Sequence, residues 1–72
     1  MQLMHLRRIE RLTTLAHNSL VAAVSSLNLH RDAATDLTRD ESALVDAQLV
    51  NNISIARDAL NQAWAIVPDN LK

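Results

Sequence analysis

The chain has 72 residues and a formal net charge of −1, and it contains no glycine, no cysteine, one proline and one aromatic residue. A chain of this length forms one domain. Without glycine it lacks the phosphate-cradling loops and nucleophile elbows of many enzymes, and without cysteine it has no disulfide or thiolate metal site. Its hydrophobic content of 49% is too high for intrinsic disorder. The composition therefore predicts one small folded domain, and it favours a reducing compartment such as the cytoplasm.

A first helix is predicted over residues 3–28. Apolar or small residues recur there at alternating spacings of three and four, which is the pattern of one helix face. These positions are Leu6, Ile9, Thr13, Ala16, Leu20, Ala23 and Leu27. Alanine and leucine have high helix propensity, and neither glycine nor proline interrupts the segment.

A link is predicted over residues 29–38, where aspartate and threonine cluster and compete for backbone hydrogen bonds outside helices. The link ends in a capping box formed by Thr38 and Glu41. The Thr38 hydroxyl is expected to accept from the Glu41 amide, and the Glu41 carboxylate to accept from the Thr38 amide. A short third helix over residues 31–37 is the alternative for this segment.

A second helix is predicted over residues 39–67. Its inward positions are Val45, Leu49, Asn52, Ala56, Ala59 or Leu60, Ala63 and Ile66. Pro68 disfavours helical geometry in the residue before it, so the helix should stop near Val67. The tail over residues 68–72 is expected to fray.

The fold class is therefore all-α, an antiparallel hairpin of two helices joined by a short link. With the turn near Ala34, we expect Ala16 to face Ile53 and Leu20 to face Leu49. Asn52 is expected at or beside the contact between the helices, where a polar residue can fix register.

The hairpin holds more apolar residues than one helix–helix contact can cover. Those partly outside the contact are Leu15, Val21, Val24, Val50, Ile55 and Ile66. Soluble monomers rarely expose so large an apolar surface, so a homodimeric four-helix bundle is expected. A monomer covered by the third helix is the alternative. The residues expected to carry self-association are Leu6, Ile9, Ala16, Leu20, Leu27, Val45, Leu49, Ile53, Ala56, Leu60 and Ala63.

Charge is unevenly distributed along the chain. Residues 1–31 hold four arginines against one glutamate, a net +3, whereas residues 32–72 hold three basic against seven acidic residues, a net −4. Arg7, Arg8 and Arg11 open the first helix, where cations oppose the helix dipole. They are expected either to bind an acidic partner or phosphate, or to be neutralised by Asp69 at the adjacent end of the second helix.

Trp64 is predicted to lie at the same end of the hairpin, close to Arg8 or His5. Tryptophan is enriched among residues that dominate binding energy. Trp64 is therefore expected either within the core or self-interface, with an arginine stacked on its ring, or in contact with a foreign partner.

Catalytic and metal chemistry have no support in the sequence. His5, His17 and His30 are too far apart to share a helix face at ligand spacing, so no metal or cofactor is expected. No residue pattern preorganises a pocket or an oxyanion site, so the chain is not expected to be an enzyme. The longest apolar run, residues 20–24, is far shorter than the roughly twenty residues that span a bilayer, and no membrane contact is expected.

These observations predict a non-enzymatic interaction module, a small helical regulator or inhibitor that binds a larger target protein through a helix face. The expected architecture resembles, in shape, the small helical hairpin dimers that act as regulators in plasmids and bacteriophages, antirepressors among them. Two other functions fit the sequence. One is a nucleic-acid-binding regulator that uses the three arginines, and the other is a structural oligomerisation module.

Overall fold

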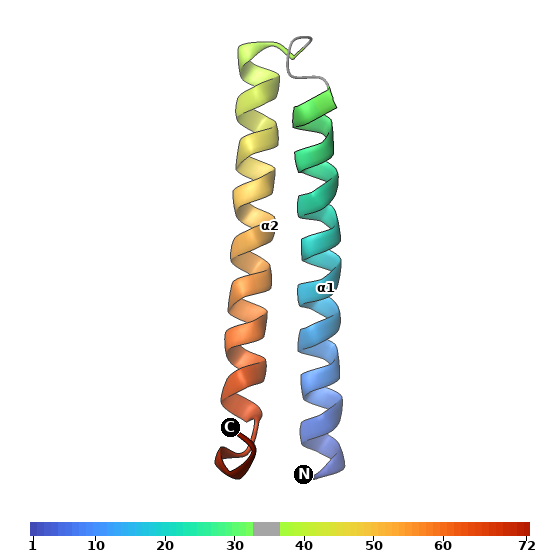
Figure 1. The fold of residues 1–72 in the computed structure, drawn as a ribbon, viewed down its shortest axis with the longest axis vertical. Helices are drawn as coiled ribbons and strands as arrows, with labels where there is room; N and C mark the ends of the chain where they lie inside the picture. Colours follow the sequence, from blue (N-terminus) through green and yellow to red (C-terminus); the bar gives the residue numbers. More distant parts are fainter. Residues whose placement is uncertain (33–36) are drawn as a thin grey trace.

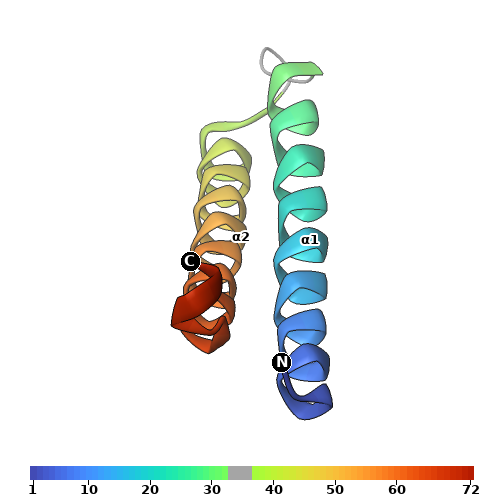
Figure 2. The same cartoon turned by 60° about the horizontal axis from the view of Figure 1, so that its bottom comes forward.

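The computed structural model describes residues 1–32 and 37–72, and over these residues the chain is helical without strands. Helix α1 spans Leu3–Asp32, helix α2 spans Arg39–Ile66, and a short 3-10 helix, η1, spans Asp69–Leu71. The two long helices run antiparallel and side by side, with both termini at the end away from the connection (Figure 1, Figure 2). The molecule is a rod of 51 × 16 × 13 Å. The predicted antiparallel hairpin is confirmed.

We call the end that holds both termini the open end (residues 1–11 and 61–72), and the other the turn end. At the turn end, α2 begins with the predicted cap, because the Thr38 hydroxyl accepts a hydrogen bond from the Glu41 amide at 3.1 Å. The Glu41 carboxylate accepts from the Thr38 hydroxyl at 3.0 Å, whereas the motif predicted the Thr38 amide as its donor. Asp40 and Glu41 add negative charge at the positive end of the α2 dipole.

Helix α2 ends one residue earlier than predicted, at Ile66. Val67 takes extended backbone angles (φ −60°, ψ 128°) directly before Pro68, as the restriction on residues preceding proline requires. The tail was expected to fray, whereas the structure places part of it in a regular turn. Residues 69–71 form η1, in which the Leu71 amide donates to the Pro68 carbonyl at 2.9 Å.

Helix α1 continues one turn beyond the predicted end at Asn28, to Asp32. Neither glycine nor proline occurs in this turn to end the helix. His30 and Arg31 lie in the last turn, where cations interact favourably with the helix dipole. The alternative of a short third helix over residues 31–37 falls largely on residues 33–36, which lie outside the described part of the chain.

The contact between the helices, which we call the seam, consists of positions that alternate in spacing by three and four and are buried or half-buried. On α1 they are His5, Ile9, Leu12, Ala16, Ser19, Ala23, Ser26 and His30. On α2 they are Ser42, Val45, Leu49, Asn52, Ala56, Ala59, Ala63 and Ile66. Ala16, Ala56 and Ala59 form the buried centre, with Leu12 packed against it. Asn52 lies in the seam, as expected.

The register of the hairpin differs from the prediction by about one turn. Ala16 packs with Ala56 and Ala59, whereas Ile53, its expected neighbour, is 49% exposed. The added turn of α1 moves the connection further along the chain and shifts every facing pair accordingly.

The seam on α1 also lies one position away from part of the predicted face. The predicted positions Leu6, Thr13, Leu20 and Leu27 are exposed. The residues just before them, which include Ser19 and Ser26, face α2 instead. Small residues let two helices approach closely, and the Ser26 hydroxyl is satisfied locally by the Ala22 carbonyl at 3.2 Å.

Candidate interaction surfaces

An extended apolar surface runs along one side of the hairpin. Each of its residues directly follows a seam residue in the chain, so on each helix they share one flank of the seam. Because the helices are antiparallel and their seam positions face each other, these two flanks lie on the same side of the rod. We call this surface the apolar face; its members are Leu6, Leu20, Val24, Leu27, Val50, Ile53, Leu60 and Trp64.

In an ordinary helical core the large apolar side chains are buried, whereas in this hairpin the small ones are buried and many large ones are exposed. Among the residues whose burial the structure describes, the buried hydrophobic ones are five alanines and Val45. All eight members of the apolar face are larger than alanine, and each is between 45% and 66% exposed. Burial of a leucine or isoleucine side chain is worth about 1.5–3 kcal/mol, and alanine contributes much less. The hairpin therefore leaves a substantial part of its large apolar surface exposed.

The opposite side of the rod is more polar. Its positions directly precede the seam residues, and on α2 they include Gln48, Asn51, Asp58 and Gln62. Met4, Leu15 and Leu29 on α1 and Leu44 on α2 are exposed on this side, but Arg8, Arg11, Asn18 and Ser25 separate and flank those on α1. The two sides therefore differ in how many large apolar residues they expose. The apolar face itself is interrupted by Thr13 and His17 on α1 and by Arg57 on α2.

The residues predicted to carry self-association fall into two groups. Ala16, Val45, Ala56 and Ala63 are buried in the seam within one chain, and Ile9 and Leu49 are half-buried there. Leu6, Leu20, Leu27, Ile53 and Leu60 belong to the apolar face. Val24 and Val50, which the sequence placed outside the helix contact, complete this face together with Trp64. The structure thus leaves the second group accessible to another molecule and uses the first to close the hairpin.

Trp64 lies on α2 near the open end and is 59% exposed. The cation over its ring is Lys72, with Nζ 5.2 Å from the ring centroid, in place of the arginine that was expected. Lys72 also lies 3.6 Å from the Asp69 carboxylate. The turn that forms η1 therefore brings Lys72 back over one face of the indole.

Arg7, Arg8 and Arg11 are exposed on the first turns of α1. Arg8 and Arg11 directly precede seam residues, which puts them on the side opposite the apolar face, and Arg7 lies on the outer surface of α1. Within the described residues, no carboxylate lies within ion-pair distance of these three arginines. Asp69, the counter-charge considered for them, pairs with Lys72 instead.

The arginines line open depressions on the outer surface of α1. Arg7 and Arg11 border one of them together with Glu10 and Thr14, and they border the next with Leu3, Met4 and Arg8. The first turn of α1 contains no acidic residue to offset the positive end of its dipole. This part of the open end is therefore suited to negatively charged groups.

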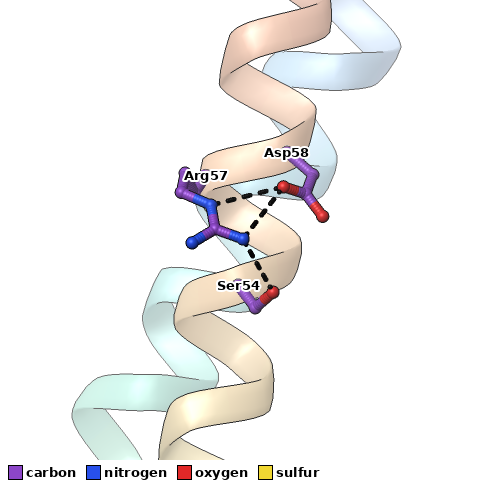
Figure 3. A network of polar contacts seen from close by, with 3 residues as sticks. All are labelled: Ser54, Arg57 and Asp58. Atoms are coloured by element: carbon purple, nitrogen blue, oxygen red, sulfur yellow. Dashed lines mark hydrogen bonds and ion pairs between the residues drawn. The ribbon is translucent and has the colours of Figure 1, made fainter.

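A polar cluster lies on α2, and its Arg57 directly follows the seam residue Ala56, on the same side as the apolar face (Figure 3). The Arg57 guanidinium donates to the Asp58 carboxylate and to the Ser54 hydroxyl, each at 3.3 Å. Both charged side chains are largely exposed, at 67% and 59%. Exposed pairs of this kind contribute about 0–1 kcal/mol, so the cluster orients Arg57 more than it stabilises the fold.

In the described part of the chain, no group of three or more His, Cys, Asp or Glu side chains is placed to hold a metal ion. Neither long helix contains a segment apolar enough to cross a membrane within the residues that the structure describes. His5, His17 and His30 lie far apart along α1, and the Nδ1 of His30 is 3.8 Å from the Asp46 carboxylate across the hairpin.

The chain was also compared with known proteins. No protein-family model matches it, and neither a curated protein nor a solved structure shows significant similarity to it.

Proposed function

We propose that this chain is a non-enzymatic protein–protein interaction module that pairs with a second copy of itself and contacts a larger target protein. The observation that carries the proposal is the set of large, exposed apolar residues on one side of a hairpin whose own core is built mainly from alanine. Two such faces packed together give a four-helix bundle and cover the side chains that a soluble monomer rarely exposes. In this arrangement Trp64 contacts the second copy.

The opposite side of the open end supplies the surface for the target. Arg7, Arg8 and Arg11 remain accessible when the apolar face is covered, because they lie on other sides of α1. Their lack of carboxylate partners within the described structure favours a partner with an acidic surface. A small regulator or inhibitor that occupies such a surface is the function that this arrangement supports best.

Self-association is tested by two matched substitutions of leucine by glutamate. Leu20→Glu places a charge on the apolar face, and Leu15→Glu places the same charge at a residue of similar exposure, 47% against 45%, on the opposite side. We expect wild type and Leu15→Glu to sediment as dimers at micromolar concentration, and Leu20→Glu as a monomer of lower helicity. A monomeric wild type, or a dimer lost only in Leu15→Glu, would contradict the proposal.

Nucleic acid is the second candidate for the arginine surface, because unpaired arginines also suit phosphate. Titration of the protein with duplex DNA and with RNA at low salt separates the two, with Arg7→Ala/Arg8→Ala/Arg11→Ala as the control. Binding that weakens steeply with salt and disappears in the triple variant would assign the surface to nucleic acid. We expect no such binding, since the single aromatic residue that could stack on a base lies on the other side of the rod.

A further inference from the structure

We propose that the second copy packs against the apolar face in the antiparallel orientation, with its turn end beside the open end of the first. This inference rests on the proposed self-association and adds its geometry. The dimer then has a twofold axis perpendicular to the rod, so that both copies use the same surface.

The distribution of charge along the rod favours this orientation. Residues 12–28, the middle of α1, contain no charged residue, so charge is concentrated towards the ends of the hairpin. The open end has a net charge of +2, and residues 29–46 around the turn hold two arginines against five carboxylates, a net −3. Antiparallel packing brings unlike ends together, whereas parallel packing brings like ends together.

The dimensions of the rod also fit a partner of equal length. A side of 51 by 16 Å covers about 800 Å², which matches the roughly 800 Å² that each partner buries in a stable complex. A second copy laid along the full length therefore covers the whole apolar face.

The side chains along the face are complementary in size when one copy is reversed. Leu60 and Trp64 make the open-end half of the face bulky, whereas Val24 and Val50 are the smaller members towards the turn end. Antiparallel packing sets the bulky half of one copy against the half with the valines in the other. Leu20 and Ile53, near the middle of the rod, lie close to the twofold axis.

Distance measurements between spin labels test the orientation, since the chain has no native cysteine. Gln2→Cys labels the open end, and Asn18→Cys labels the middle of α1; both residues are exposed. At a rise of about 1.5 Å per residue, antiparallel packing separates the two Gln2→Cys labels by more than about 40 Å, and parallel packing brings them within about 25 Å. The Asn18→Cys labels lie about 20–30 Å apart in either orientation, because helices are roughly 10 Å across.

The pair of labels separates two kinds of failure. A short distance at Asn18→Cys together with a long one at Gln2→Cys supports the antiparallel dimer. Short distances at both positions overturn the orientation while self-association stands. The absence of any intermolecular distance at Asn18→Cys, with the labelled protein folded and monomeric by sedimentation, overturns the self-association itself and this inference with it.

Discussion

Lys72 lies over the ring of Trp64, with its Nζ 5.2 Å from the ring centroid and 3.6 Å from the Asp69 carboxylate. The turn after Pro68 thus brings a cation onto the only aromatic side chain of the protein. One face of the indole contacts Lys72 while the side chain as a whole stays 59% exposed. The open end therefore presents a tryptophan that has a cation over one face of its ring.

Replacement of Lys72 by glutamine tests this contact. A cation–π pair at an exposed site is worth about 0.5–1 kcal/mol, so Lys72→Gln should lower the free energy of unfolding by no more than that. Loss of the nearby charge should also shift the fluorescence emission of Trp64. Arg39→Gln, which removes a cation at the turn end, is the control and should leave the emission unchanged. Identical spectra for the two variants would show that Lys72 and Trp64 are apart in solution.

Removal of the cap at the start of α2 should be more costly. In Thr38→Ala the Glu41 amide loses its hydrogen-bond acceptor, and the expected loss of stability is about 1 kcal/mol, measured by thermal or urea unfolding. Thr14→Ala is the matched control, because Thr14 is exposed within α1 and alanine has the higher helix propensity. If Thr14→Ala destabilises the protein as much as Thr38→Ala, the cap has no special role.

The small residues of the seam are expected to resist enlargement. Ala56 is 2% exposed between the helices, so Ala56→Leu must push α1 and α2 apart, at a cost of about 1–3 kcal/mol. Ala47→Leu adds the same atoms to an exposed position of the same helix and should be close to neutral. The midpoints of thermal or urea unfolding of the two variants are compared. Equal midpoints would mean that the helices do not pack through Ala56.

Introduced cysteines can report the register of the hairpin. Ala16 and Ala56 belong to one buried cluster, so the double variant Ala16→Cys/Ala56→Cys should form an intramolecular disulfide under mild oxidation. Ala16→Cys/Ile53→Cys follows the register predicted from the sequence and should remain largely reduced within the monomer. Mass spectrometry of the unreduced monomer distinguishes the products, and the reverse result would restore the predicted register.

The sequence predicts α2 more accurately than α1. On α2 the inward positions were correct, and the structure resolves the open choice between Ala59 and Leu60 in favour of Ala59. On α1 the hydrophobic pattern selected Leu6, Leu20 and Leu27, because they are the most apolar residues near the contact. The seam uses the smaller residues before two of them, Ser19 and Ser26, since helix separation depends on side-chain size as well as polarity.

The candidate surfaces were predicted in part for a similar reason. The excess of apolar residues and the basic start of the first helix are visible in composition and spacing. The register of the hairpin could not be predicted in the same way. It differs from the predicted register by about one turn, because α1 is one turn longer than the sequence indicated. The pairing of Asp69 with Lys72 depends on η1. Hydrophobic periodicity does not predict a single local turn of this kind.

The inverted order of side-chain sizes has a consequence for the life of the protein in a cell. Under the proposed pairing, much of the stability of each hairpin comes from its neighbour, so the folded fraction rises with the amount of protein present. Chains at low abundance would open more often and be degraded sooner, because proteases act on the open form. A small change in the rate of synthesis would then produce a larger change in the amount of intact protein. The placement of alanines in the seam and leucines outside it sets the concentration at which this happens.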